Sequence, residues 1–161
     1  MKKIVIAAAC LVCMSILFNY NARGEMELIA PDFRIQDLDK NTVELKNFRG
    51  KPVLLFFWTT WCPFCLKELK TLNKTSVELS KKGVELLVIN TSEREHNARR
   101  VAKNYNLSFR VFLDEDGSVA DAFGVYGVPT FVLIDKNGNL VFSDNTFPRE
   151  EIDMLCPQKS F

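Results

Sequence analysis

The chain has 161 residues, of which 47% are hydrophobic and 25% are charged, and its 21 Lys and Arg residues nearly balance its 20 Asp and Glu residues. This length suits a single hydrophobic core, because one domain usually spans about 100–200 residues. The 13 Phe residues and many aliphatic ones exclude an intrinsically disordered chain. A net charge of +1 argues against a nucleic-acid or anionic-membrane surface, so we expect one globular domain with no nucleic-acid partner.

The first 24 residues have the features of an export signal. Lys2-Lys3 form a short basic start, residues 4–18 form an apolar run without a charge, and Ala22-Arg23-Gly24 places small residues where a signal peptidase cleaves. The rest of the chain is close to neutral once this segment is removed. We therefore expect an exported protein located in the periplasm, which is an oxidising compartment.

Two other interpretations of the N-terminus stay open. The apolar run at residues 4–18 is shorter than the roughly 20 residues that a spanning helix needs, but if it is not cleaved it would tether the protein to the inner membrane. Lipid attachment at Cys10 or Cys13 is weaker, because the residues before them lack the usual Leu-small-small pattern. We divide the chain into a signal peptide or anchor at 1–24 and one folded domain at 25–161.

The first elements of this domain are predicted from hydrophobic patterning. Two alternating runs, residues 33–35 and 42–45, flank polar turn material and predict an N-terminal hairpin. Residues 53–58 are continuously apolar, which is typical of a central strand covered on both faces. A helix is predicted from Pro63 to just before Gly83. Its apolar face carries Cys65, Leu69, Leu72 and Leu79, and its opposite face carries Lys67, Lys70, Lys74 and Lys81.

The second half alternates strands and helices. Residues 84–90 predict another buried strand, and Ser92 and Glu95 stand at the spacing of a capping box that would start the next helix. Apolar residues recur in that helix at Ala98, Val101, Ala102 and Tyr105. The remaining expected elements are a strand over 109–113, a short helix capped by Ser118 and ended by Gly124, strands over 130–134 and 140–142 joined through Asn137-Gly138, and a closing helix over 148–155. This order indicates a layered α/β domain.

Three cysteines lie beyond the N-terminal segment, and Cys62 and Cys65 are separated by only two residues. Cys62 stands where the predicted strand gives way to a helix, so unpaired N–H groups and the positive end of the helix dipole face its sulfur and favour the thiolate. Cys65 follows one helical turn later, where it can attack a mixed disulfide formed by Cys62. We expect Cys62 to attack a substrate disulfide and Cys65 to resolve the intermediate.

Two other uses of the pair remain open. A zinc site would need Cys156 and the single His96 as further ligands, but His96 falls on the polar side of its helix and no second close pair is present. A purely structural disulfide would stabilise the fold poorly, because it closes a very short loop. We therefore expect a redox-active pair, with no metal and no separate cofactor.

The segment Trp58-Thr59-Thr60-Trp61-Cys62-Pro63-Phe64-Cys65, followed downstream by Gly127-Val128-Pro129-Thr130-Phe131, resembles the thioredoxin fold. More narrowly, residues 30–155 resemble the exported TlpA/ResA-type thiol-disulfide oxidoreductases. The resemblance implies a three-layer α/β sandwich with a central mixed sheet and flanking helices. It also implies an N-terminal hairpin and a strand-helix unit inserted before Pro129.

The resemblance also assigns roles to single residues. It implies a cis peptide bond before Pro129 next to the cysteine pair, and an extended backbone at Val128 to which a substrate segment can add. It further implies that Glu68 exchanges a proton with Cys65, although a solvated Glu68 paired with nearby lysines is the alternative. An apolar rim of Trp61, Pro63 and Phe64 would contact substrate, whereas Trp58 belongs either to that rim or to the core.

Departures from the family leave the direction of electron flow open. Phe56 stands where thioredoxin has a buried Asp, and the Pro63-Phe64 dipeptide between the cysteines is neither that of thioredoxin nor that of the DsbA oxidants. The dipeptide tunes the reduction potential within a range of roughly −270 to −120 mV. We favour a reductant of exported disulfides, as in cytochrome c maturation, over a DsbA-like oxidase. Its electron donor would be a membrane thiol protein.

Two rival functions belong to other classes. A peroxiredoxin-type peroxidase is compatible with Thr59 three residues before Cys62, but that class favours a Pro where Leu55 stands and needs no second cysteine at Cys65. A non-catalytic thioredoxin-like binding module would not need either cysteine. We expect Cys156 to be non-catalytic and the protein to be a monomer.

Overall fold

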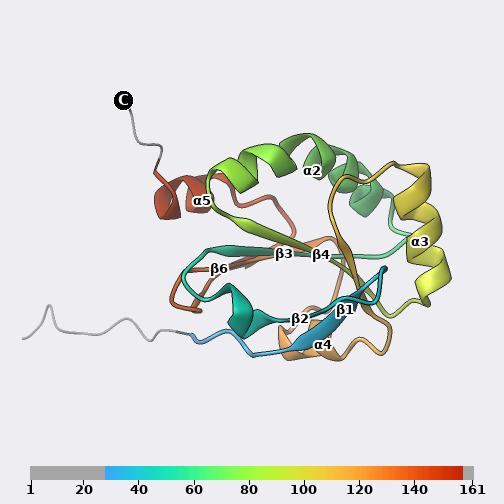
Figure 1. Ribbon diagram of the computed structural model, residues 1–161, viewed down its shortest axis with the longest axis horizontal. Helices are drawn as coiled ribbons and strands as arrows, with labels where there is room; N and C mark the ends of the chain where they lie inside the picture. Colours follow the sequence, from blue (N-terminus) through green and yellow to red (C-terminus); the bar gives the residue numbers. More distant parts are fainter. Residues whose placement is uncertain (1–27, 158–161) are drawn as a thin grey trace, which may run out of the picture.

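A computed structural model describes residues 28–157. These form a seven-stranded sheet with helices on both faces (Figure 1). The strands are β1 (Arg34–Asp37), β2 (Thr42–Glu44), β3 (Val53–Trp58), β4 (Glu85–Thr91), β5 (Val111–Asp114), β6 (Thr130–Ile134) and β7 (Leu140–Asp144). The helices are the 3-10 helix η1 (Leu45–Phe48) and the α-helices α2 (Pro63–Lys81), α3 (Glu95–Asn104), α4 (Ser118–Ala122) and α5 (Arg149–Leu155). The export signal, the anchor and the lipidation sites predicted within residues 1–24 lie outside the described residues.

The strand order in the sheet is β2-β1-β5-β4-β3-β6-β7. Strands β3, β4 and β5 are parallel neighbours, while β6 and β7 extend the sheet antiparallel beyond β3 and β1 pairs antiparallel with β5. Helices α2 and α3 connect the parallel strands, as crossovers between parallel strands require. The predicted thioredoxin-like α/β fold, its N-terminal hairpin β1-β2 and its inserted unit β5-α4 are confirmed.

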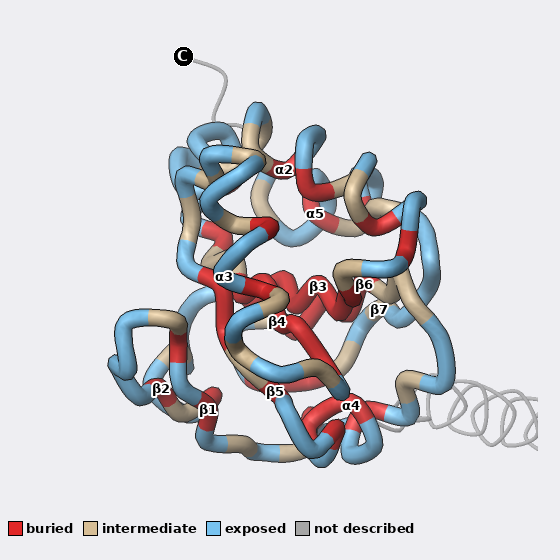
Figure 2. The backbone as a smooth tube through the Cα atoms, turned by 90° about the vertical axis from the view of Figure 1, so that its right-hand side faces the viewer, coloured by how far each residue is buried: buried red, intermediate tan, exposed pale blue. Residues whose placement is uncertain are grey.

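The six residues of β3 divide the interior into two cores. Leu54, Phe56 and Trp58 face the layer of α2 and α5, and the alternate residues of the strand face α4 and the N-terminal hairpin. All six side chains are buried, because a central parallel strand is covered on both faces. Figure 2 shows these buried strands between α2 and α5 on one side and α4 on the other. The cysteine pair belongs to the α2 side, since Cys62 and Cys65 pack into that core.

Two helix starts differ from the sequence-based prediction. Helix α3 begins at Glu95 with no side-chain cap, because Ser92 has a left-handed φ of 56° and its N–H donates to the carbonyl oxygen of Asp114 at 2.8 Å. The N–H of Glu95 instead donates to the carboxylate of Glu115 at 2.7 Å. The capping box predicted at Ser92 and Glu95 is therefore wrong.

Helix α4 is also capped differently from the prediction. Its N-cap is Gly117, which has a positive φ of 75°, and Ser118 is its first residue rather than its cap. The buried carboxylate of Asp114 accepts the N–H groups of Val119 and Ala120, both at 3.0 Å. The preceding strand β5 extends to Asp114 rather than ending at residue 113, because its last residue pairs with β4.

Candidate active site

The cysteine pair lies at the junction of β3 and α2. Strand β3 ends at Trp58, and the N–H of Cys62 donates to the carbonyl oxygen of Thr59 at 3.4 Å, which closes a turn. Cys62 is the N-cap of α2 and forms a disulfide with Cys65 across a Cα–Cα distance of 5.2 Å. The predicted strand-turn-helix arrangement is confirmed, and its two sulfur atoms are within bonding range.

The start of α2 faces the sulfur of Cys62. This Sγ accepts the N–H of Cys65 at 3.1 Å, and Pro63 occupies the first turn, where its missing N–H leaves no unpaired donor. Cys65 is fully buried and Cys62 is nearly so. The positive end of a helix dipole stabilises a negative charge at this position, so the site can hold Cys62 as a thiolate once the disulfide is reduced.

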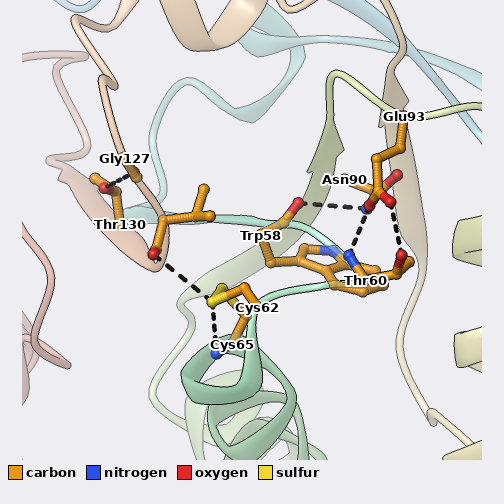
Figure 3. Close-up of a disulfide and its surroundings, with 9 residues drawn as sticks. Trp58, Thr60, Cys62, Cys65, Asn90, Glu93, Gly127 and Thr130 are labelled. Carbon is orange, nitrogen blue, oxygen red and sulfur yellow. Dashed lines mark hydrogen bonds between the residues drawn. A yellow bond between two sulfur atoms is a disulfide. The ribbon is translucent and has the colours of Figure 1, made fainter.

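A loop from the other half of the chain packs against this sulfur. The peptide bond between Val128 and Pro129 is cis, as the resemblance implied, and the carbonyl oxygen of Val128 lies 3.6 Å from the Sγ of Cys62 (Figure 3). The hydroxyl of Thr130 donates to the carbonyl oxygen of Gly127 at 2.7 Å and fixes the same loop. The structure therefore brings Val128 and Pro129 to the cysteine pair.

Three aromatic side chains project from the segments that carry the pair and the loop. Trp61 is 71% exposed, Phe64 is 73% exposed and Tyr126 is 97% exposed. Trp58, in contrast, is fully buried and belongs to the core rather than to the rim. The sequence analysis did not name Tyr126, which lies in the loop just before the Gly127-Val128-Pro129 segment.

A polar cluster borders the turn before Cys62. The carboxylate of Glu93 accepts the backbone N–H and the hydroxyl of Thr60, both at 2.6 Å, and the side-chain amide of Asn90 at 2.9 Å (Figure 3). Asn90 is fully buried at the end of β4, opposite Trp58 in the sheet. Neither Glu93 nor Asn90 was singled out from the sequence, because each is brought to the turn by strand pairing.

The other candidate residues lie apart from this turn or at its margin. Glu68 is half-buried on α2, three residues after Cys65, and His96 is exposed on α3. Cys156 is a free, half-buried cysteine at the end of α5, and burial raises the pKa of its thiol. Within residues 28–157, no group of three or more His, Cys, Asp or Glu residues is arranged to hold a metal ion. No helix of this part of the chain is long and apolar enough to cross a membrane.

Comparisons with known proteins show which family the chain resembles. The chain matches the AhpC/TSA family over residues 27–143. The thiol-disulfide oxidoreductase ResA of Bacillus cereus is 36% identical over 124 residues, which cover 77% of this chain and 72% of that protein. ResA of Geobacillus thermodenitrificans is 40% identical over 111 residues, which cover 69% of this chain and 64% of that protein.

A solved structure shows the same architecture. It is a secreted disulfide oxidoreductase of Mycobacterium tuberculosis, homologous to DsbE of E. coli, with 28% identity and a TM-score of 0.64. The match covers 72% of this chain and 84% of that one. The disulfide at the start of α2 is the feature that an enzyme of this type needs. The chain therefore belongs to the AhpC/TSA family and, within it, to the thiol-disulfide oxidoreductases of the ResA type.

Proposed function

We propose that this oxidoreductase reduces disulfides of exported proteins, with Cys62 as the attacking thiolate and Cys65 as the resolving thiol. The observation that carries the proposal is the position of Cys62, whose Sγ caps α2 and bonds to Cys65. A sulfur at a helix N-terminus has a lowered pKa and is nucleophilic at neutral pH. A second sulfur within bonding range lets the dithiol pass two electrons to a substrate disulfide and form the Cys62–Cys65 disulfide.

The reaction begins with the reduced dithiol. The thiolate of Cys62 attacks one sulfur of the substrate disulfide, so a mixed disulfide forms and one substrate thiolate leaves. Cys65 then loses its proton and attacks the Sγ of Cys62, which releases the second substrate thiolate and restores the Cys62–Cys65 disulfide. Two electrons pass to the substrate, whose two thiolates take up protons. A thiol donor must then reduce the enzyme again, and we propose a membrane thiol protein in this role.

Substrate binding is assigned to the surface around the pair. The backbone at Val128 and Pro129 lies against Cys62 and can pair with an extended substrate segment. Exposed Trp61 and Phe64, with Pro63 between the cysteines, provide an apolar contact surface beside the attacking sulfur. The exposed ring of Tyr126 extends this surface on the loop that precedes Pro129.

Glu68 is proposed to exchange a proton with Cys65. Phe56 is buried where thioredoxin has an acid, and it stacks on Phe131 with ring centroids 4.6 Å apart. That strand position therefore carries no titratable group, and the half-buried Glu68 lies one helical turn beyond Cys65. We expect Glu68→Gln to change the pH dependence of the resolving step, with Lys67→Gln on the same helix as a control. An unchanged pH profile would show that Glu68 is a solvated side chain that exchanges no proton with Cys65.

The cellular setting is also a proposal. The signal-like residues 1–24, cleaved or retained as an anchor, and the secreted relative from Mycobacterium tuberculosis support export to the periplasm. The ResA relatives are named thiol-disulfide oxidoreductases, which supports disulfides as substrates, and we propose that these belong to exported proteins, apocytochrome c among them. We propose that the enzyme acts as a monomer, because the cysteine pair and the Val128–Pro129 loop come from a single chain.

Insulin reduction by the reduced protein tests the function. We expect turnover with dithiothreitol as donor, no turnover in Cys62→Ser, and a trapped mixed disulfide in Cys65→Ser. Peroxide consumption measured beside it separates this activity from that of a peroxiredoxin. The reduction potential of the Cys62–Cys65 pair, determined in glutathione buffers, gives the direction of electron flow. A value near that of DsbA would contradict the reductase and indicate a dithiol oxidase.

A further inference from the structure

The turn that ends at Cys62 is held by a side chain from another strand connection. Thr60 is the second residue of the turn that the N–H of Cys62 closes on Thr59. Both hydrogen-bond donors of Thr60, its N–H and its hydroxyl, donate to Glu93 at 2.6 Å. A carboxylate that accepts two such bonds fixes the residue geometrically, because charge-assisted hydrogen bonds are shorter and stronger than neutral ones.

Glu93 is itself anchored to the sheet. The side-chain amide of Asn90 donates to the same carboxylate at 2.9 Å and to the carbonyl oxygen of Trp58 at 3.3 Å. Asn90 has no exposed surface and stands opposite Trp58 in the parallel pair β3-β4. The last residue of β3 and the turn beyond it are therefore both connected to β4 through these two side chains.

The backbone of the β4-α3 connection is bent so that Glu93 reaches the turn. Ser92 has a φ of 56°, a conformation that non-glycine residues rarely adopt, and its N–H donates to the carbonyl oxygen of Asp114. Helix α3 starts only at Glu95, so Glu93 stays outside the helix. A left-handed residue at this point is an observed outlier of the kind that occurs at functional sites.

We infer that Glu93 is a positioning residue for Cys62. Glu93 acts through Thr60 and does not touch the sulfur. Glu93 fixes the turn, and the turn sets the Sγ of Cys62 against the N–H of Cys65 at the start of α2. This inference rests on the proposed role of Cys62 as the attacking thiolate. Loss of the hydrogen bonds between Glu93 and Thr60 frees the turn and moves the Sγ of Cys62 away from the N-terminus of α2. The thiolate fraction of Cys62 then falls.

The test is the pH profile of Cys62 alkylation in the reduced protein, in a Cys156→Ser background, with iodoacetamide and peptide mass spectrometry. We expect Glu93→Ala to raise the pKa of the Cys62 thiol, read as the midpoint of this profile, by about one unit. Glu93→Gln should leave this pKa within about 0.3 unit of the parent value, because its amide oxygen can accept the N–H of Thr60 and its NH₂ can donate to the Thr60 hydroxyl.

Two further variants complete the design. Thr60→Val keeps the backbone N–H and removes only the hydroxyl bond, so it should raise the pKa of the Cys62 thiol by about half a unit. Glu115→Ala is the matched control, because Glu115 also accepts one backbone N–H, that of Glu95 at 2.7 Å, without a contact to the turn. Its alkylation profile should equal that of the parent. Thermal unfolding identifies the variants that are folded, and if Glu93→Ala does not fold, Thr60→Val and Glu93→Gln decide the outcome.

Either of two results would overturn the inference. One is an unchanged profile in folded Glu93→Ala, or in Thr60→Val where the alanine variant does not fold. The other is a Gln variant in which the pKa of the Cys62 thiol rises by more than about half a unit, which would assign the effect to the charge of Glu93 rather than to its hydrogen bonds. Alkylation needs no protein substrate, so a failure of the parent to reduce insulin would contradict the proposed function and leave this measurement intact.

Discussion

Cys62 and Cys156 lie at opposite types of helix end, one at the N-terminus of α2 and the other at the C-terminus of α5. Cys62 is the N-cap of α2 and its sulfur accepts a backbone N–H, whereas Cys156 is the C-cap of α5, where the negative end of the dipole lies. Burial raises the pKa of the Cys156 thiol, the positive charge of Lys82 opposes this rise, and Asp153 adds to it. Cys62 is the more buried of the two, so helix position, and not exposure, separates the nucleophile from the spare thiol.

The largest expected effect is on turnover. Cys62→Ala should lower insulin reduction by more than about a thousandfold, because no other group supplies the attacking sulfur. Cys156→Ala should leave the rate unchanged. Steady-state rates of the two variants, each checked for folding by circular dichroism, make the comparison. A loss of rate in Cys156→Ala would give the spare thiol a part in the cycle.

The second effect is the difference in reactivity between the two thiols of one reduced molecule. At pH 7 we expect Cys62 to react with iodoacetamide about tenfold faster than Cys156. Its larger thiolate fraction is partly offset by the weaker nucleophilicity that accompanies a lower pKa. Time-resolved peptide mass spectrometry gives both rates in one sample. Equal rates would show that the helix ends do not control these thiols.

A smaller effect comes from the charges beside Cys156. Lys82→Met should raise the pKa of the Cys156 thiol further and slow its alkylation about twofold to threefold, because a stabilising positive charge is removed. Asp153→Asn should have the opposite sign. The alkylation rate of Cys156 as a function of pH, measured in both variants, checks the pair of signs. Shifts in the same direction would contradict the assigned roles.

The smallest effect is on stability at alkaline pH. The folded state raises the pKa of the Cys156 thiol, so this group contributes stability below its unfolded pKa and loses that contribution as the pH rises through the folded value. Cys156→Ser should therefore make the decrease of Tm between pH 8 and pH 10 less steep than in the parent protein. Between pH 6 and pH 7, where the thiol is protonated in both states, the slope of Tm against pH should be the same in the two proteins. Calorimetry across this range, with the parent protein as reference, measures the difference.

The parts of the fold that follow from one segment were predicted correctly. Strand β3 and helix α2 each carry their pattern within a few consecutive turns or residues, so the position of Cys62 between them was readable. The hairpin β6-β7 followed from Asn137-Gly138 for the same reason. Local patterning is sufficient where the residues that define an element are consecutive in the chain.

The errors occur where a group outside the expected motif supplies the hydrogen-bond partner. Ser92 and Ser118 both have local sequence contexts typical of helix caps, but Asp114 binds the backbone near one and caps the helix that starts at the other. Glu93 reaches Thr60, which is 33 positions away in the chain. No periodicity encodes a single long-range hydrogen bond, so the polar surroundings of the turn required the structure.

The arrangement of the two Trp residues of the chain has a spectroscopic consequence. Trp58 lies in the interior and Trp61 faces water, and both stand within four residues of Cys62. Indole emission is blue-shifted in an apolar interior and is quenched by electron transfer to a nearby disulfide. We therefore expect the intrinsic fluorescence to change when the Cys62–Cys65 disulfide is reduced, so that emission spectra can follow the redox state of the protein without a label.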